Sequence, residues 1–387
     1  MTDLDPVLKA ADADLDASIE RMFDLVRIAS VSTDPAFKAE CRRTAETIAA
    51  DLSSLGFDAT VRDTPGHPMV VAHYTPKSGA GSPHVLFYGH YDVQPPDPLD
   101  KWDTPPFEPV RKRGKDGVER LYGRGTADDK GQLMTFIEAM RAFIKVRGTL
   151  PVKTTILLEG EEESGSPSLV PFLEANKDEL SCDVAFVCDS GMWDAKTPAI
   201  TTRLRGMVKD EITITGPRVD LHSGAYGGPA QNPIRVLSKL LAALHDRNGR
   251  ITVPDFYDGV TELPKAVKAQ WRSLKFSDAK FLKEVGLSQP AGEKGKSVLE
   301  QIWSRPTAEV NGIWGGYTGA GTKTVLPSEA HAKITFRLVG KQNPKKILKN
   351  WRAFAKAHVP KDCKISFAPY GSGSPASEVK EDNPFIA

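Results

Sequence analysis

The sequence predicts an α/β domain with a mostly parallel sheet and helices on both faces, into which a smaller α+β domain is inserted. Two observations lead to this fold class. Up to about residue 204, short apolar runs alternate with segments of helical periodicity, and continuously apolar strands are typical of a sheet covered on both faces. From residue 205 onwards, strand patterns alternate between apolar and polar residues, as in strands with one solvated face.

The elements of the first part follow in chain order. Helical spacing of apolar residues predicts helices near residues 17–29 and 41–55. A third helix is predicted over 131–148, and Gly148 is its expected end because glycine readily adopts the left-handed backbone that terminates many helices. Four short apolar runs predict buried strands: MVVAHY (69–74), HVLFYG (84–89), TTILLE (154–159) and VAFVC (184–188).

The second part has its own strands and a helix. Three runs predict strands: MVKDEITITG (207–216), AHAKITFRL (330–338) and KISFAPY (364–370). A helix is expected to begin at Pro233, because proline suits the first turn of a helix. The Gly/Ser/Pro-rich segment 371–377 predicts an irregular break. We therefore assign residues 1–204 and 374–387 to the α/β domain and residues 205–373 to the inserted domain.

Composition excludes several classes of function. A chain of 387 residues is long enough for two domains, each with its own core. The net charge of +1 gives no electrostatic footprint for nucleic acid or a membrane surface, so neither partner is expected. No apolar run approaches the roughly 20 residues that span a bilayer, and the acidic segment 1–16 resembles neither a signal nor a transit peptide. The four cysteines lack paired spacing, which favours reduced thiols and a cytoplasmic location.

Carboxylates and one imidazole gather at the carboxyl ends of the predicted strands. Because the ends of parallel strands meet at one edge of a sheet, these side chains are expected to lie together. Carboxylate oxygens combined with imidazole bind divalent ions such as zinc, manganese or cobalt. The candidates are His90 with Asp92, Asp128 with Asp129, the run Glu161, Glu162 and Glu163, and Asp189. The sequence therefore predicts the metal site of a metal-dependent hydrolase at this edge.

Some of these acids also have an ordinary structural interpretation. Asp129 precedes a helix and could be its N-terminal cap, and Glu161 is expected to be an exposed neighbour of the other two glutamates. One of the adjacent aspartates, Asp128 or Asp129, is better explained as a carboxylate that bridges two cations and offsets their repulsion. Asp92 is expected to accept the imidazole N–H of His90 that does not face the metal.

Six motifs make the chain resemble the M20 family of metallopeptidases, and most of all its carnosinase-type dipeptidase branch. They occur in the family's order and are GHYDVQP (89–95), YGRGTADDKG (122–131), EGEEESGS (159–166), CDSGMW (188–193), DLHSGAYGG (220–228) and GAGTKTVLP (319–327). Gln94 and Pro95 at the end of the first motif, and the long stretch 311–327, favour that branch over the family's N-acyl amino acid deacylases.

The resemblance implies a zinc-peptidase-like catalytic domain with a dinuclear metal centre. The metal ligands would be His90 and Asp189 on one ion, Glu163 on the other, and Asp128 between them. Zinc is the first expectation, with manganese or cobalt as alternatives. Glu162 would be the general base, Asp92 would support His90, and a cis peptide bond would join Asp128 to Asp129.

The resemblance also implies that the inserted domain is a ferredoxin-like lid that forms a homodimer. His222 would enter the partner subunit's site and stabilise the oxyanion. Arg337 and Thr324 would hold the C-terminal carboxylate of a dipeptide or short peptide, since guanidinium offers paired donors. Family members continue beyond the lid to a late histidine that would complete the ligands of the ion on Glu163. The sequence to Ala387 lacks this motif, so we expect a C-terminally incomplete chain.

Two other functions are consistent with the same sequence. A deacylase that cleaves N-acyl amino acids would use the same site chemistry, and only its substrates would differ. A non-catalytic, dimerising protein with an incomplete metal site would account for the absent histidine. The presence of Glu162 and His222 argues against this last interpretation.

Overall fold

The computed structural model describes residues 4–76, 82–369, 371–380 and 382–386. The chain divides into two compact units, Met1–Ile200 and Thr201–Ala387. The first unit ends four residues before the predicted domain boundary, and the segment after residue 374 groups with the second unit. Its assignment to the α/β domain stays a prediction. None of the helices in the described ranges is both long and apolar enough to span a bilayer.

The first unit contains a five-stranded mixed sheet in the order β1-β2-β6-β3-β7. Its strands are β1 (Asp58–Arg62), β2 (Met69–Tyr74), β3 (His84–His90), β6 (Lys153–Glu159) and β7 (Val184–Val187). Strand β3 is parallel to β6 and β7, whereas β2 is antiparallel to β1 and β6. The expectation of a mostly parallel sheet was therefore wrong. The short link 63–68 makes β1 and β2 an antiparallel hairpin. The composition of an apolar strand does not indicate whether its neighbours run parallel or antiparallel to it.

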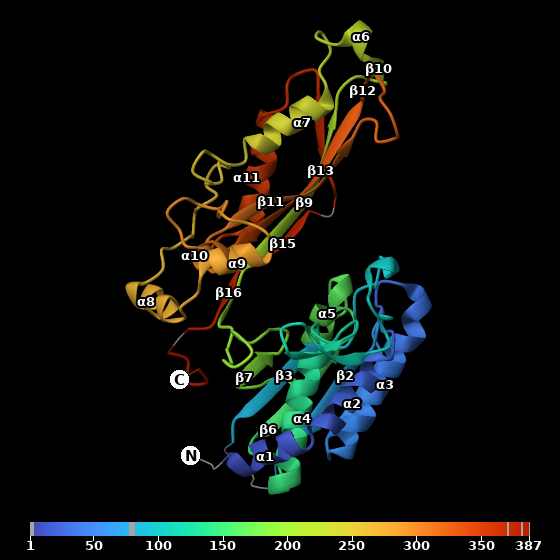
Figure 1. Cartoon of the computed structure of the whole chain (residues 1–387), viewed down its shortest axis with the longest axis vertical. Helices are drawn as coiled ribbons and strands as arrows, with labels where there is room; N and C mark the ends of the chain where they lie inside the picture. Colours follow the sequence, from blue (N-terminus) through green and yellow to red (C-terminus); the bar gives the residue numbers. More distant parts are fainter. Residues whose placement is uncertain (1–3, 77–81, 370, 381, 387) are drawn as a thin grey trace. The chain divides into compact units, whose positions relative to one another are not determined.

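Helices cover both faces of this sheet (Figure 1). On one face, α2 (Leu15–Val26), α3 (Lys38–Ser54) and α4 (Lys130–Arg147) share a core with apolar residues of β2 and β6. On the other face, α5 (Leu169–Ala175) packs near Met69, Val71 and Leu157. As predicted, Gly148 ends α4, with φ 70° and its N–H 2.8 Å from the carbonyl oxygen of Ile144. The described part of this unit also contains α1 (Asp5–Ala13), β4 (Val110–Arg113), β5 (Glu119–Tyr122) and short 3-10 turns.

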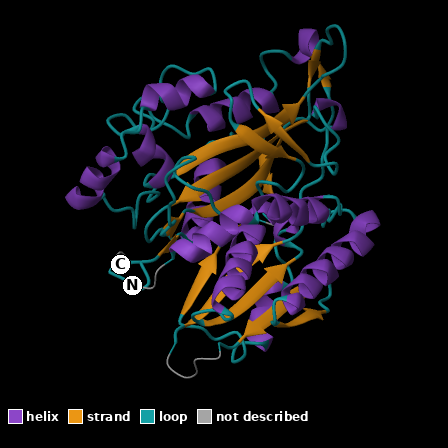
Figure 2. Cartoon of the chain, turned by 60° about the horizontal axis from the view of Figure 1, so that its bottom comes forward, coloured by secondary structure: helices purple, strands orange, loops and turns teal. Residues whose placement is uncertain are grey.

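The second unit contains a separate antiparallel sheet in the order β11-β13-β9-β14, with β15 also paired to β9. Its strands are β9 (Gly206–Thr215), β11 (Thr307–Gly315), β13 (Glu329–Leu338), β14 (Lys364–Phe367) and β15 (Ser372–Ser374). Helices α7 (Pro233–Ala242) and α11 (Pro344–Ala357) share one core with the sheet (Figure 2). The chain order β9-α7-β11-β13-α11-β14 is that of a split β-α-β, or ferredoxin-like, unit.

Period-two alternation in this sheet is as predicted, because alternate residues of β13 are buried against the helices. The predicted break at 371–377 was wrong in part, since Ser372–Ser374 pairs with β9. Residue 370, the end of the last predicted strand, lies outside the described residues. The smaller elements are β8 (Arg203–Leu204), β10 (Leu221–His222), α6 (Ser223–Tyr226), α8 (Lys265–Ser273), α9 (Asp278–Glu284), α10 (Val298–Trp303), β12 (Val325–Leu326) and β16 (Ser377–Glu378).

Candidate metal centre

The parallel strands of the first unit bring the predicted metal ligands to one edge of the sheet. His90 is the last residue of β3 and lies opposite Glu159, the last residue of β6. Asp189 follows β7 by two residues, and β7 is parallel to β3. Asp128 comes from the turn before α4, where the peptide bond between Asp128 and Asp129 is cis, as the resemblance implied.

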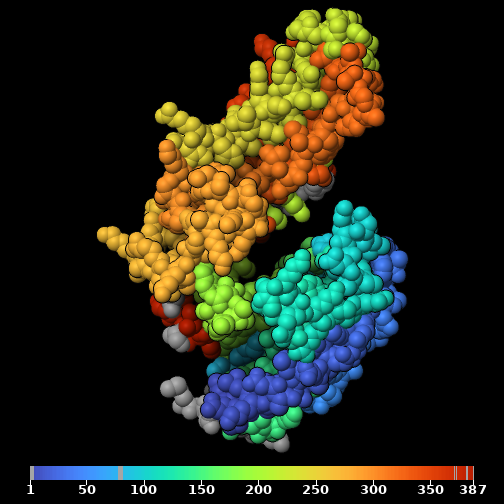
Figure 3. Space-filling model, in the orientation of Figure 1, coloured from blue at the N-terminus to red at the C-terminus, as the bar shows by residue number. Residues whose placement is uncertain are grey.

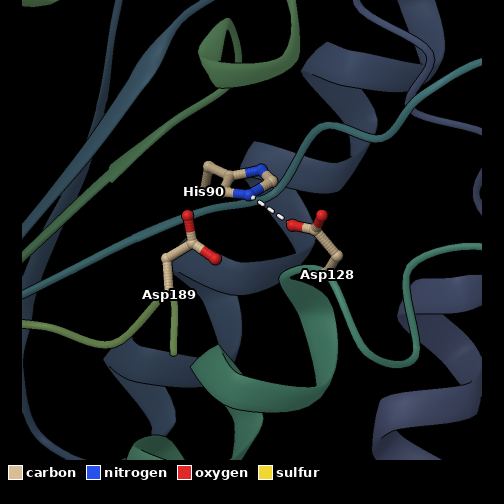
Figure 4. A group of neighbouring side chains, drawn as sticks. All are labelled: His90, Asp128 and Asp189. Carbon is tan, nitrogen blue, oxygen red and sulfur yellow. Dashed lines mark hydrogen bonds and ion pairs between the residues drawn. The ribbon is translucent and has the colours of Figure 1, made fainter. Parts of the chain in front are cut away.

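His90, Asp128 and Asp189 form a close group (Figure 4). Their candidate ligand atoms all lie within 4.8 Å of one another, and Nε2 of His90 is 3.1 Å from Oδ1 of Asp128. The imidazole is fully buried, whereas both carboxylates are exposed. Two carboxylates at this separation repel each other, and a divalent cation between them would offset the repulsion. The donor set of one imidazole and two carboxylates fits such an ion.

Asp92 connects His90 to the turn that carries Glu162 and Glu163. The Asp92 side chain is fully buried, and its Oδ1 lies 3.3 Å from Nδ1 of His90. The same carboxylate accepts the backbone N–H groups of Glu162 and Glu163, at 3.2 and 3.1 Å. Burial disfavours a charged imidazole, but hydrogen bonding and attraction from Asp92 raise the pKa of His90 to about 10. The field at this sheet edge is therefore strongly negative, which favours a cation.

Glu162 and Glu163 lie in a short 3-10 turn, η3 (Glu162–Ser164), directly after β6. Burial raises the pKa of both carboxyl groups above the ordinary glutamate value. Glu163 lies outside the close group and accepts a hydrogen bond of 2.7 Å from Nε2 of Gln94. In the sequence, Gln94 marks only the family branch, and nothing in its pattern predicts this contact.

Two acids near the site have different environments from those predicted. Asp129 makes no side-chain cap to α4; instead it is fully buried and accepts the backbone N–H of His90 at 3.0 Å. Burial raises its pKa to about 7. Glu161 is only 4% exposed, because it fills the space beside Gly66, where a Cβ atom would lie 1.6 Å from its Oε1. Its expected exposure was wrong.

Lys130 is a structural residue that the sequence reasoning missed. It is fully buried at the start of α4, and its Nζ donates to the carbonyl oxygens of Leu25 and Ile28 at 2.8 and 2.7 Å. These bonds join the end of α2 to the turn that carries Asp128. A lysine in the first turn of an amphipathic helix normally lies at the surface, so a single sequence gives no signal for this burial.

Replacing Asp92 by asparagine is expected to weaken metal binding roughly 10- to 100-fold, the usual effect of losing a residue that supports a metal-binding histidine. The amide NH2 group cannot accept a hydrogen bond, so one of the two backbone N–H groups loses its acceptor. Titration of the metal-free protein with zinc or manganese measures the change. Asp100→Asn, at an exposed aspartate, is the control. Equal affinity in both variants would contradict the supporting role of Asp92.

His222 and Thr324 lie close together in the second unit, and the roles predicted for them stay predictions. Nε2 of His222 lies 3.3 Å from Oγ1 of Thr324, where β10 pairs with β12, and both side chains are exposed. Figure 3 shows these two segments (yellow-green and orange) side by side at one end of the unit. Arg337 lies eight residues beyond Glu329 on β13, about 26 Å of extended strand. One chain therefore does not bring Arg337 to the His222–Thr324 pair.

Comparison with known proteins decides the family. The profile of peptidase family M20/M25/M40 matches residues 86–386, which is most of the chain. The chain belongs to this family. The M20 chain is 31% identical over 348 residues to the Cys-Gly metallodipeptidase dug1 of Schizosaccharomyces pombe, a match that covers 87% of this chain and 72% of that protein.

Two further relatives place the M20 chain in the same branch. It is 30% identical over 355 residues to the human Beta-Ala-His dipeptidase, covering 88% of this chain and 69% of that protein. The crystal structure of human carnosine dipeptidase 1 superposes with a TM-score of 0.81 at 28% identity, covering 99% of this chain and 83% of that one. The predicted resemblance to the carnosinase-type dipeptidase branch is thus confirmed.

Proposed function

We propose that this M20 protein is a metal-dependent dipeptidase that hydrolyses dipeptides or short peptides with a free C-terminal carboxylate. The observation that carries the proposal is the close group of His90, Asp128 and Asp189 in a chain whose relatives include Cys-Gly and Beta-Ala-His dipeptidases. The Asp92 contact, which holds His90 and the Glu162 turn together, supports it.

The proposed centre holds two divalent ions, most simply zinc, with manganese or cobalt as alternatives. His90 and Asp189 would hold one ion, Glu163 the other, and Asp128 both. Such ions polarise a scissile carbonyl and lower the pKa of a nearby water. The two exposed carboxylates of the group and the negative field that raises the pKa of His90 fit these cations.

The proposed proton transfers belong to Glu162. Its carboxylate would accept a proton from the attacking water and deliver it to the nitrogen of the departing amine, as a general base and then a general acid. His222 would donate a hydrogen bond to the oxyanion. Arg337 and Thr324 would bind the substrate's C-terminal carboxylate, which would restrict the enzyme to short peptides.

We also propose that the second unit is a lid through which two copies form a homodimer, with His222 acting in the partner subunit's site. Mixing His222→Ala with Glu162→Gln, each inactive alone, should then restore about a quarter of wild-type activity, since half of randomly exchanged dimers carry one intact site. The measurement is dipeptide hydrolysis after co-refolding or co-expression. A mixture as inactive as its components would contradict the shared site.

The first experiment is a substrate panel on metal-loaded protein. Cys-Gly and β-Ala-His are compared with their C-terminal amides and with N-acetyl amino acids. The proposal expects cleavage of the free dipeptides and at least roughly tenfold slower cleavage of the amides. Cleavage of N-acetyl amino acids alone would indicate a deacylase. A protein that binds fewer than two ions per chain and cleaves nothing would indicate the non-catalytic, dimerising alternative with its incomplete metal site.

A further inference from the structure

A cavity of about 290 Å³ lies within the second unit, beside the start of β9. Its polar lining includes Arg203, Arg205, Glu262, Ser304, Ser377 and Glu378. The volume is enough for a small ligand group and a few waters. The charges around it decide what kind of group that would be.

Three of the four charged residues in this lining already have partners. Arg203 pairs with Glu378 at 2.9 Å, and Glu262 pairs with Lys296 at 2.7 Å. Arg205 is half-buried and makes no hydrogen bond or ion pair with any described residue. A half-buried guanidinium with five donors and no acceptor loses hydration without compensation.

A second cation stands next to Arg205. Arg337 on β13 lies opposite Met207 of β9, and Arg205 precedes Met207 by two residues, so it continues the same polar face of the sheet. Arg337 also has no ion pair among the described residues. Burial, together with the positive charge of Arg337, lowers the pKa of Arg205 below its usual value. The negative charge of Glu309 opposes this lowering of the Arg205 pKa. Glu309 is exposed on β11 and forms no ion pair with Arg205.

We propose that Arg205 and Arg337 together bind one carboxylate, and that Arg205 is a second binding residue for the C-terminus of the peptide substrate. The identity of the ligand rests on the proposed function, whereas the paired-guanidinium site does not. Each guanidinium presents a planar fork of donors that matches a carboxylate. An anion between the two would offset their mutual repulsion and satisfy donors that otherwise have no acceptor.

The test is calorimetric titration of the metal-loaded full chain with N-acetylglycine, a monocarboxylate, and with N-acetylglycinamide, its neutral match. Arg205→Gln is expected to weaken N-acetylglycine binding by roughly tenfold or more, since two charge-assisted hydrogen bonds are lost. Arg205→Lys keeps the charge but loses the planar fork of donors, so its affinity for N-acetylglycine should lie between those of wild type and Arg205→Gln. Lys209→Gln removes one exposed positive charge from β9, the strand that follows Arg205, and should bind like wild type. Because Arg205→Gln removes one of two repelling charges, its Tm should not fall.

Arg205-dependent binding of N-acetylglycine, with no effect of Lys209→Gln, supports the site. Equal affinity of Arg205→Gln and wild type overturns it, as does Arg205-dependent binding of inorganic phosphate without binding of N-acetylglycine. If the site binds the carboxylate in this way but the wild type cleaves no dipeptide, the dipeptidase proposal fails and the anion site stands. If dipeptides are cleaved with an unchanged KM in Arg205→Gln, the proposed role of Arg205 fails and the dipeptidase proposal stands.

Discussion

Glu162→Gln is expected to lose hydrolysis while it keeps its metal. Glutamine has nearly the same shape as glutamate but cannot accept the proton of the attacking water, and loss of a general base typically lowers kcat by about 10²- to 10⁴-fold. Among the described residues, the Glu162 carboxylate makes no hydrogen bond that positions another ligand. The hydrogen bond from its backbone N–H to Asp92 survives the substitution. Dipeptide hydrolysis and elemental analysis of the same preparation measure the two effects.

The matched control is Glu163→Gln, one residue further along the same turn. This variant should lose both turnover and part of its bound metal, because Glu163 is proposed as a ligand and not as the base. Its hydrogen bond from Gln94 can be kept by the amide oxygen, so the fold of the turn should be preserved. Turnover near the wild-type level in Glu162→Gln would remove Glu162 as the base. Metal loss in that variant would make it a ligand instead.

His90→Ala is expected to abolish both metal binding and activity, since it removes the buried imidazole from the close group. In wild-type protein, a ligand at roughly 100 times its Kd stabilises the native state by about 2.7 kcal/mol. Adding zinc to metal-free wild type should therefore raise its Tm, and this rise should be absent in His90→Ala. Thermal unfolding with and without zinc or manganese measures the difference.

His84→Ala is the control at the opposite end of the same strand. It removes an imidazole whose Nε2 lies 2.7 Å from Oγ1 of Thr155 and is not part of the close group. The metal-dependent rise in Tm should persist in this variant. A metal-dependent rise of wild-type size in His90→Ala would show that the ions bind elsewhere on the chain.

The position of the site could be predicted because it depends on strand ends. The apolar run HVLFYG predicted β3 nearly to the residue, so that His90 had to lie at its carboxyl end. The same reasoning placed Asp189 after β7, and parallel pairing of β3 with β7 brought the two side chains together. The link between Asp92 and His90 followed from their separation by two residues.

The environment of the neighbouring residues could not be predicted, because it depends on contacts that are distant in sequence. Glu161 is buried because Gly66, on a separate loop, leaves room for it. Lys130 is buried because two carbonyl groups, one in the last turn of α2 and one just beyond the helix, accept its hydrogen bonds. A single sequence shows that a residue is charged, but it does not show which distant backbone groups will meet it.

The relative direction of the strands and the exposure of the edge strand could not be predicted, for a related reason. An apolar run such as MVVAHY is equally suited to parallel and antiparallel neighbours, and only the short hairpin link from β1 shows its direction. Strand β7 lies at the edge of the sheet, so Val187 is 53% exposed although its sequence reads as core. Burial of such a strand depends on its place in the sheet, which local composition does not encode.

The length of β13 has a kinetic consequence. His222 and Thr324 lie beyond one end of this strand and Arg337 near the other, much further apart than the two ends of a dipeptide. A catalyst that needs all three groups on one small substrate has to draw them from separate molecules. Its specific activity should then fall when the protein in the assay is diluted below the dissociation constant for two copies of the chain. The apparent rate would vary with the square of the protein concentration in that range and linearly above it.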